Sequence, residues 1–138
     1  MPAFHLLPDV YALVQLPRGH ETPAWAERAG DGTFVSISRT PTDRSIVCPE
    51  SAVPPEQPRH SGWRCLVVRG PLDLGLVGVM ASIAVPLADA RVPIFPIATY
   101  ETDYILVPAT ELARACAALR AAGHDVEGVG TAAGTAES

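Results

Sequence analysis

Apolar and polar residues alternate over short distances along most of the chain, in the two periodicities that indicate strands and helices. Residues 33–39 alternate with Val35 and Ile37 facing one way, which indicates a strand. Similar alternating or short apolar segments predict strands at residues 4–7, 10–16, 33–39, 44–48, 63–69, 94–98, 104–107 and 125–127. Pro8 and Asp9 are expected to separate the first two strands.

Two longer segments place their apolar residues at the spacing of a helix buried on one side. The first has an apolar stripe that consists of Leu76, Val79, Met80, Ile83 and Leu87. Asp73 is a candidate N-cap for this helix, and Pro86 is expected to kink or interrupt it. The second helix is predicted from residue 109 or 110 to about residue 122, with Gly123 as its stop. A short helix is predicted at residues 23–29.

The two halves of the chain repeat the order β-α-β-β. Ile37 is followed five residues later by Thr42-Asp43, and Ile97 is followed five residues later by Thr102-Asp103. A further helix and strand are clear only in the second half, which then has the β-α-β-β-α-β order of ferredoxin-like folds. The sequence therefore predicts an α+β protein with two tandem units and antiparallel sheets, the first unit being shortened. The predicted ranges are residues 1–60 for the first unit with its linker, 61–127 for the second, and 128–138 for a disordered tail.

Charge and hydropathy restrict the classes of partner. The net charge is −5, and the ten basic residues form no cluster, which argues against binding to a nucleic-acid backbone. The start "MPAFHLLPDVY" lacks the basic and apolar regions of a signal peptide. The longest uncharged apolar run, residues 74–88, is too short to span a bilayer and contains Pro86. A cytoplasmic protein without a membrane or nucleic-acid partner is expected.

Cysteine and histidine residues are scattered along the sequence. The residues are Cys48, Cys65, Cys116, His5, His20, His60 and His124. No two cysteines have C-x-x-C spacing, so we expect three buried, small apolar side chains. No histidine lies at metal-ligand spacing from a cysteine or carboxylate. We therefore expect neither a metal nor another cofactor.

The second half carries two long motifs. The segments "WRCLVVRGPLDLGLVGVMASIAVPLADARVPIFPIATYETDYILV" and "ELARACAALRAAGH" resemble the tandem ACT-domain proteins of bacteria. That family has runs of the type W-R-x-L-x-V-x-G-P-L-D and I-F-x-I-S-T-Y-x-T-D-Y-x-L-V. The resemblance is close over Trp63–His124 and weaker in the first half, including "SIVCPE". The chain is also similar to the ACT pairs of aspartate kinases and of cytosolic arginine sensors.

This resemblance implies two ACT-like units, a regulatory role in binding an amino acid, and a homodimer. In ACT modules the ligand lies where the loop after the first strand meets the next helix, and a neighbouring hairpin closes the site. The implied loop residues are Asp73, Leu74, Gly75, Leu76, Val77 and Gly78. The implied hairpin residues are Thr99, Tyr100, Glu101, Thr102 and Asp103.

Physical chemistry supports the same placement. A zwitterionic amino acid needs a site for its carboxylate, which a helix N-terminus offers through unpaired N–H groups. Gly75 and Gly78 have no side chain that would block a ligand from the backbone. A carboxylate on the hairpin, best Asp103, would receive the ammonium group, and the hydroxyls of Thr99 and Thr102 could add a hydrogen bond.

Each of these residues also has a structural interpretation. Asp73 as an N-cap would occupy N–H groups that the ligand needs. The two glycines could allow close packing of helix on sheet, and Tyr100 and Tyr104 could pack against strands. Thr102 and Asp103 could instead cap their own turn.

Three positions depart from the family pattern. Ala98 stands where serine is usual, which removes a hydroxyl near the implied site. Pro96 lies inside a strand and deletes a ladder donor, so that strand is predicted to be an edge strand or to carry a bulge. Arg91 replaces an expected glycine and, in a left-handed conformation, would cost about 1 kcal/mol.

The main hypothesis is a small-molecule sensor or regulatory module that binds an amino acid or a similar small metabolite and has no catalytic activity. The alternative is an ACT-like dimerisation or protein-interaction module with an empty site. A small enzyme is less favoured, because neither Cys48 with His60 nor Ser82 forms a nucleophile–base set in a recognised context.

Overall fold

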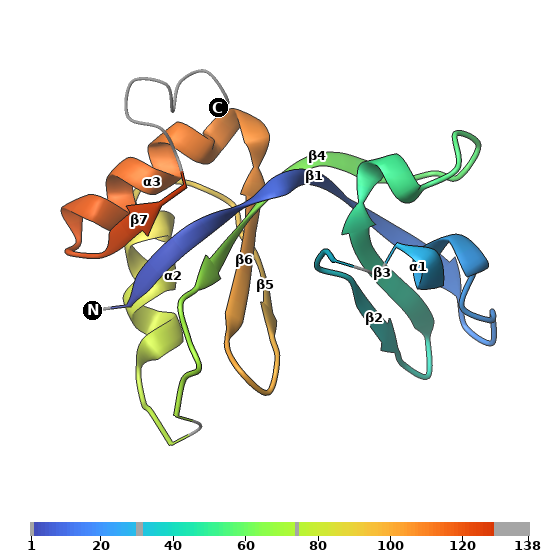
Figure 1. The fold of residues 1–138 in the computed structure, drawn as a ribbon, viewed down its shortest axis with the longest axis horizontal. Helices are drawn as coiled ribbons and strands as arrows, with labels where there is room; N and C mark the ends of the chain where they lie inside the picture. Colours follow the sequence, from blue (N-terminus) through green and yellow to red (C-terminus); the bar gives the residue numbers. More distant parts are fainter. Residues whose placement is uncertain (1, 30–31, 74, 129–138) are drawn as a thin grey trace. The chain divides into compact units, whose positions relative to one another are not determined.

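The computed structural model describes residues 2–29, 32–73 and 75–128. It divides into two compact units, which Figure 1 shows as two groups of elements. The small unit is Asp9–Trp63, and the large unit combines residues 2–8 with the described residues from Arg64 onward. The sequence placed residues 2–8 in the first unit, whereas they pack with the large one; most of the predicted 128–138 tail lies outside the described residues.

The elements follow one another along the chain as the sequence largely predicted. They are β1 (Ala3–Pro17), α1 (Ala24–Arg28), β2 (Ser36–Arg39), β3 (Asp43–Pro49), the 3-10 turn η1 (Glu50–Ala52), β4 (His60–Val68), α2 (Val79–Asp89), β5 (Phe95–Ala98), β6 (Asp103–Pro108), the 3-10 turn η2 (Ala109–Glu111), α3 (Leu112–Ala121) and β7 (Asp125–Glu127). Strands β1 and β4 each contribute residues to both units.

The predicted break at Pro8 and Asp9 is wrong, because β1 is continuous. Its residues 3–5 pair in parallel with β7, and its residues 11–17 pair antiparallel with β3. Pro8 lies between these two paired stretches, so neither of them needs the N–H group that proline lacks. The position that the sequence marked as a break is where the chain passes between the two units.

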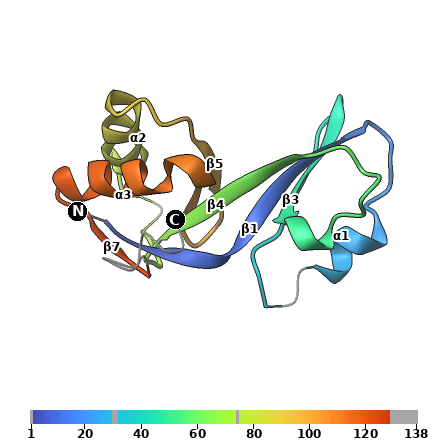
Figure 2. The same ribbon diagram turned by 90° about the horizontal axis from the view of Figure 1, so that it is seen from above.

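In the large unit the strands lie in the order β7-β1-β4-β6-β5, and α2 and α3 pack on one face of them (Figure 2). Residues at every second position of the inner strands point into this core. The fully buried side chains of the core include Phe4, Leu66, Val68, Ile83, Leu87, Ile105, Val107, Leu112 and Leu119. The βαββαβ order and the antiparallel β5–β6 hairpin confirm the predicted ferredoxin-like α+β fold.

Helix α2 begins at Val79, so the prediction of Asp73 as its N-cap is wrong. The Asp73 carboxylate accepts the N–H of Gly75 at 2.8 Å, and the Asp73 carbonyl accepts the N–H of Leu76 at 3.0 Å. This local turn competes with helix formation, as aspartate side chains commonly do. The N-cap is Gly78, whose φ of 83° lies in the left-handed region that favours glycine.

Pro86 does not interrupt α2, which continues to Asp89. Arg91 has φ 61°, so this position does keep the left-handed conformation in which arginine carries a cost. Pro96 lies in β5, the last strand in the order, so the prediction of an edge strand is confirmed. Proline is tolerated in an edge strand because one side of that strand has no neighbouring strand to which a backbone N–H would donate.

The small unit contains β2, β3 and the second part of β1, in that order, with α1 packed beside them. Its buried core consists of Ala12, Val14, Leu16, Ala26, Ile46, Cys48 and Val53. All three cysteines of the chain are buried free thiols, as predicted. Burial raises the pKa of Cys48 to about 11 and that of Cys65 to about 12, so these thiols stay protonated near neutral pH.

The described residues show neither a membrane-spanning helix nor a group of metal-binding side chains. None of their helices combines the length and the apolar character needed to cross a bilayer. Within the same residues, no three histidine, cysteine or carboxylate side chains gather closely enough to hold a metal ion.

Candidate functional site

A cavity of about 180 Å³ opens in the large unit between the loop after β4, the start of α2 and the β5–β6 hairpin. Its lining residues are Leu72, Asp73, Leu76, Val79, Ala98, Thr99, Tyr100, Glu101, Thr102 and Asp103. The five predicted hairpin residues therefore meet Asp73 and Leu76 from the predicted loop. A wider depression next to this cavity shares Leu72, Asp73, Tyr100 and Glu101 with it.

Some predicted loop residues lie elsewhere. Gly75, Val77 and Gly78 are not among the described lining residues, and the Val77 side chain is 95% exposed. Leu74 lies outside the described residues. Gly78 acts through its backbone conformation at the helix start, as described above, which is a different role from the predicted open approach to a ligand.

The sequence prediction missed Leu72, Val79 and Ala98 as lining residues. Leu72 is held by its backbone, whose N–H donates to the carbonyl of Glu101 at 2.8 Å. A backbone contact of this kind leaves no mark in the sequence. Ala98 did carry a signal, because it departs from the family's serine at a position beside the hairpin turn.

Gly70 allows the loop to approach the hairpin closely. A Cβ atom at this position would lie 3.1 Å from the Thr102 Cβ and 3.3 Å from the Glu101 carbonyl oxygen. The Thr102 side chain is buried, and its hydroxyl donates to the Val68 carbonyl at 2.7 Å. Gly70 and Thr102 thus fix one wall of the cavity against the end of β4.

The hairpin turn is closed by its own threonines. The N–H of Thr99 donates to the Thr102 carbonyl at 2.9 Å, and the Thr99 hydroxyl donates to the same oxygen at 3.0 Å. The Thr102 N–H donates to the Thr99 hydroxyl at 3.3 Å. These bonds stabilise a turn that contains neither glycine nor asparagine. The Thr99 hydroxyl has a structural role within the turn, and the Thr102 hydroxyl has one in its bond to Val68.

Asp103 does not take part in that network. It is half-buried in the cavity wall opposite Ala98, its partner in the β5–β6 register. Within the described part of the chain, its carboxylate makes no hydrogen bond or ion pair. Charged side chains in proteins are stabilised by partners, and this carboxylate is open to one that enters the cavity.

The charge of the cavity is negative. Asp73, Glu101 and Asp103 contribute carboxylates, and the described lining contains no lysine, arginine or histidine. Beside the cavity, burial is the main cause that raises the pKa of Tyr104, followed by the nearby Cys65 and Glu101. A positively charged group is therefore the favoured occupant near these carboxylates.

The start of α2 supplies the opposite polarity. The first N–H groups of a helix have no partner within the helix and carry partial positive charge. Gly78 offers no side chain to cap them, and Val79, the first residue of α2, lines the cavity. A ligand carboxylate near Val79 would meet the partial positive charge of the helix start. A ligand ammonium group near Asp103 would meet the negative charge of its carboxylate.

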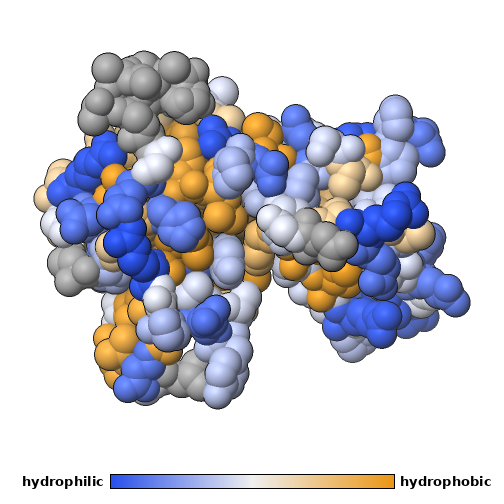
Figure 3. Space-filling model, in the orientation of Figure 1, coloured by the Kyte–Doolittle hydropathy of each residue, from blue (hydrophilic) through white to orange (hydrophobic). Residues whose placement is uncertain are grey.

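Apolar residues surround the entrance. Leu76 is 54% exposed and Tyr100 is 85% exposed, and both line the cavity. Figure 3 shows apolar atoms at the surface at its lower left, over the segment that leads into α2. The entrance therefore offers apolar contact to a ligand side chain or to a protein surface.

Comparisons with known proteins agree with this architecture. The ACT domain model matches residues 59–121, and a model of an N-terminal domain matches residues 9–56. No curated protein matches the chain at a significant level.

Three solved structures illustrate the likeness. Protein Atu0741 from Agobacterium tumefaciens is 31% identical with a TM-score of 0.83, and 91% of each chain is covered. Protein VC0802 from Vibrio cholerae, described as of unknown function and a possible transport protein, is 19% identical with a TM-score of 0.69, covering 85% of this chain and 86% of that one. The ligand-free regulatory subunit of aspartate kinase from Thermus thermophilus is 15% identical with a TM-score of 0.55, covering 88% and 97%.

The chain therefore contains an ACT domain, a regulatory and ligand-binding type of domain, at residues 59–121. It belongs to the same family as the Agobacterium protein Atu0741, with which it shares nearly its whole length. The two more distant structures share the fold.

Proposed function

We propose that the large unit binds a small amino acid, or a metabolite with the same two charged groups, in the cavity between the 70–79 loop and the β5–β6 hairpin. The observation that carries this proposal is the Asp103 carboxylate, which has no partner in the described part of the chain and lines a cavity shared with the start of α2. The protein would act as a regulatory or sensor module, not as an enzyme.

The two ends of the cavity suit the two ends of an amino acid. The ammonium group would donate hydrogen bonds to Asp103, with Glu101 and Asp73 adding negative potential. The ligand carboxylate would accept N–H groups of the first turn of α2, beginning at Val79. The Asp73 carboxylate is already held by the N–H of Gly75, so it contributes charge more than a free hydrogen-bonding position.

The size of the cavity limits the ligand. Pockets for drug-sized molecules measure about 300–1,000 Å³, so a cavity of about 180 Å³ suits a molecule of a few heavy atoms. Leu72, Leu76 and Val79 give part of its lining an apolar character, which favours a ligand with a short apolar side chain. With so few anchors, we expect dissociation constants from about 1 μM to 1 mM, or about −8 to −4 kcal/mol.

A matched pair of variants tests the proposal. Calorimetric titration and thermal shift against the twenty amino acids should find at least one that binds the wild type. Asp103→Asn should lose that binding at least tenfold, while Asp43→Asn, in the hairpin of the small unit, should keep it. Silence from all twenty amino acids, or equal binding by wild type and Asp103→Asn, would contradict the proposal.

We also propose a homodimer as the assembly in which such a module works. The exposed side chains of Leu76, Val77 and Tyr100 support an interaction surface beside the cavity. Light scattering during size exclusion should then give twice the chain mass of 14.5 kDa. A monomer at all concentrations would remove this part of the proposal and leave the ligand site in place.

A further inference from the structure

Helix α2 contains Pro86 and still continues for three residues beyond it. In an α-helix the carbonyl of residue i accepts the N–H of residue i+4, so the Ser82 carbonyl should receive its bond from position 86. Proline has no N–H, which leaves that carbonyl without its helical donor. The His124 ring nitrogen Nε2 lies 2.9 Å from the Ser82 carbonyl oxygen. His124 therefore supplies the donor that Pro86 lacks.

The other nitrogen of the same ring faces a second carbonyl. Nδ1 of His124 lies 2.9 Å from the carbonyl oxygen of Pro2, just before β1. The residue is 2% exposed, and its ring meets Phe4 edge to face, with the ring centres 5.4 Å apart. A neutral imidazole has one N–H and one lone pair, whereas the imidazolium has two N–H groups. The carbonyl oxygens of Pro2 and Ser82 can therefore both accept a hydrogen bond from the His124 ring only when the ring is doubly protonated.

The two carbonyl groups that contact the His124 ring differ in how easily they can lose that contact. The Ser82 carbonyl lies within α2 and has no donor from position 86. Pro2 precedes the first residue of β1, where the chain can move away at small cost. When the ring is neutral, we expect Nε2 to keep its proton and its bond to Ser82. The lone pair of Nδ1 then faces the Pro2 carbonyl, and this contact must open.

We propose that His124 forms a proton-dependent fastening at the N-terminal end of β1. By this we mean the two hydrogen bonds that one doubly protonated ring donates to the carbonyls of Pro2 and Ser82. The protonated ring ties Pro2 and α2 together, and loss of one proton releases Pro2. The neighbouring contacts limit the movement, because the Arg69 N–H donates to the Ala3 carbonyl at 2.7 Å and residues 3–5 pair with β7. The fastening needs no ligand, so it goes beyond the function proposed above.

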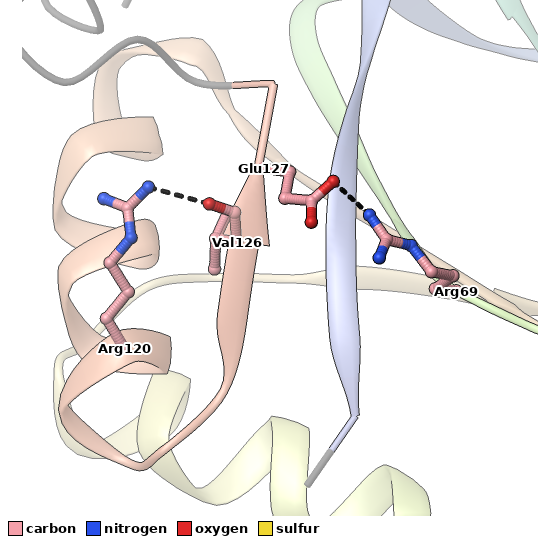
Figure 4. Close-up of polar contacts among 4 residues, drawn as sticks. All are labelled: Arg69, Arg120, Val126 and Glu127. Carbon is pink, nitrogen blue, oxygen red and sulfur yellow. Dashed lines mark hydrogen bonds and ion pairs between the residues drawn. The ribbon is translucent and has the colours of Figure 1, made fainter.

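Several charged side chains lie on the elements around His124, and some of them have partners of their own. Those on the elements packed against it are His5 on β1, Asp89 and the following Arg91 at the end of α2, Glu111, Arg114 and Arg120 on η2 and α3, and Asp125 and Glu127 on β7. Arg120 donates to the Val126 carbonyl, and Glu127 pairs with Arg69 across β1 (Figure 4). Arg114 pairs with Glu111 at 3.3 Å.

Within the described residues, none of these side chains forms a hydrogen bond or ion pair with the His124 ring. Among the described residues, no carboxylate is bonded to the ring, and two neutral carbonyls hold its nitrogens. Loss of one proton from the ring removes one of the two hydrogen bonds, because a neutral imidazole has a single N–H. The sign follows from the donor count: the fastening is present at low pH and is lost as the pH rises.

Nuclear magnetic resonance tests the proposal on the full chain. At about pH 5 the ¹⁵N shifts of His124 should show both ring nitrogens protonated, and at about pH 8 only Nε2, if the two carbonyl contacts depend on the second proton as proposed. Hydrogen-exchange protection factors of the Phe4 and His5 amides should fall at least tenfold over the same change. His5→Gln is the matched control, because its exposed ring should not affect this fall.

Pro86→Ala separates the proposal from a merely structural role. Alanine returns an N–H to the Ser82 carbonyl, so the neutral ring is free to place its single proton on Nδ1 and keep Pro2. The protection factors should then be the same at both pH values. His124→Phe should give low protection at both, and Pro86→Ala remains informative if that variant does not fold. A pH-dependent fall in Pro86→Ala equal to that of the wild type, or a singly protonated ring at about pH 5, would overturn the proposal.

Discussion

The two hairpins of the chain, β2–β3 in the small unit and β5–β6 in the large unit, have the same four-residue turn. Each turn begins with a threonine, and the N–H of Thr40 or Thr99 donates to the carbonyl three residues later, at 3.0 Å and 2.9 Å. The hydroxyls of both threonines donate to the same carbonyls. Polar side chains in these turns are therefore a structural device that the two units share.

The hairpins differ at the residue that follows the turn. The strand registers pair Arg39 with Arg44 and Ala98 with Asp103, so Arg44 and Asp103 occupy the same position. The Arg44 guanidinium donates to the carbonyls of Thr40, Asp43 and His20, and thereby ties the turn to the loop after β1. Asp103 has no such bonds in the described chain. The residue after the turn is thus bonded within its own hairpin in the small unit and borders the cavity in the large unit.

Exchanging this residue should have the largest effect. Asp103→Arg removes the carboxylate and places a cation where the ligand's ammonium group is expected, so affinity should fall at least a hundredfold, which is about 2.8 kcal/mol. Titration calorimetry measures this loss with an amino acid that binds the wild type. Unfolding in urea serves as the control, and we expect a change within about 0.5 kcal/mol because Asp103 has no intramolecular partner to lose.

The buried threonine should show the next effect. Thr102→Val removes the hydroxyl that donates to the Val68 carbonyl, and an unsatisfied buried carbonyl costs about 1–3 kcal/mol. The free energy of unfolding in urea measures this cost. Asp43 holds the equivalent place in the other turn but is only partly buried, whereas Thr102 is buried, so Asp43→Val should destabilise less. Equal losses in the two variants would show that the turns are not as different as described.

The sequence predicted both hairpins but aligned them one residue out. Counting from Ile37 and Ile97 equated Asp43 with Asp103, whereas the paired strands equate Asp43 with Thr102. Side chains alternate between the two faces of a strand, so an error of one residue assigns the wrong face. The sequence therefore identified the hairpin that lines the cavity, but it could not tell which residue of the first hairpin corresponds to Asp103.

Local chemistry was easier to predict than contacts between distant segments. The edge-strand position of Pro96 followed from the residue type itself, and the left-handed conformation of Arg91 from the glycine that the resembled family has at this position. The start of α2 was mispredicted because Asp73 and Gly78 both resemble helix starts, and only the structure shows that Asp73 bonds Gly75 instead. The Ser82 carbonyl, which cannot receive an N–H from Pro86, is met by His124, 42 residues further along the chain, and no periodicity could reveal this contact.

The smallest expected effect concerns acid stability. Hydrogen bonds from Thr40 and then from Gln15 lower the pKa of Asp43, while Asp103 has no comparable donors. Because a lowered pKa favours the charged form in the folded state, Asp43 stabilises the fold above the usual aspartate range and loses this contribution as the pH falls through its lowered pKa. Thermal midpoints of wild type and Asp43→Asn should therefore differ most near neutral pH and converge in acid. A difference that stays constant down to about pH 2 would contradict this assignment.

The proposed ligand site is bordered by the hairpin of the large unit and not by its twin in the small unit. Backbone amide shifts followed by nuclear magnetic resonance during titration with a binding amino acid test it most directly. We expect shifts at Thr99–Asp103 and at the first residues of α2 from Val79, with Thr40–Arg44 unchanged. Equal shifts in both hairpins, or shifts confined to residues away from the cavity, would contradict it.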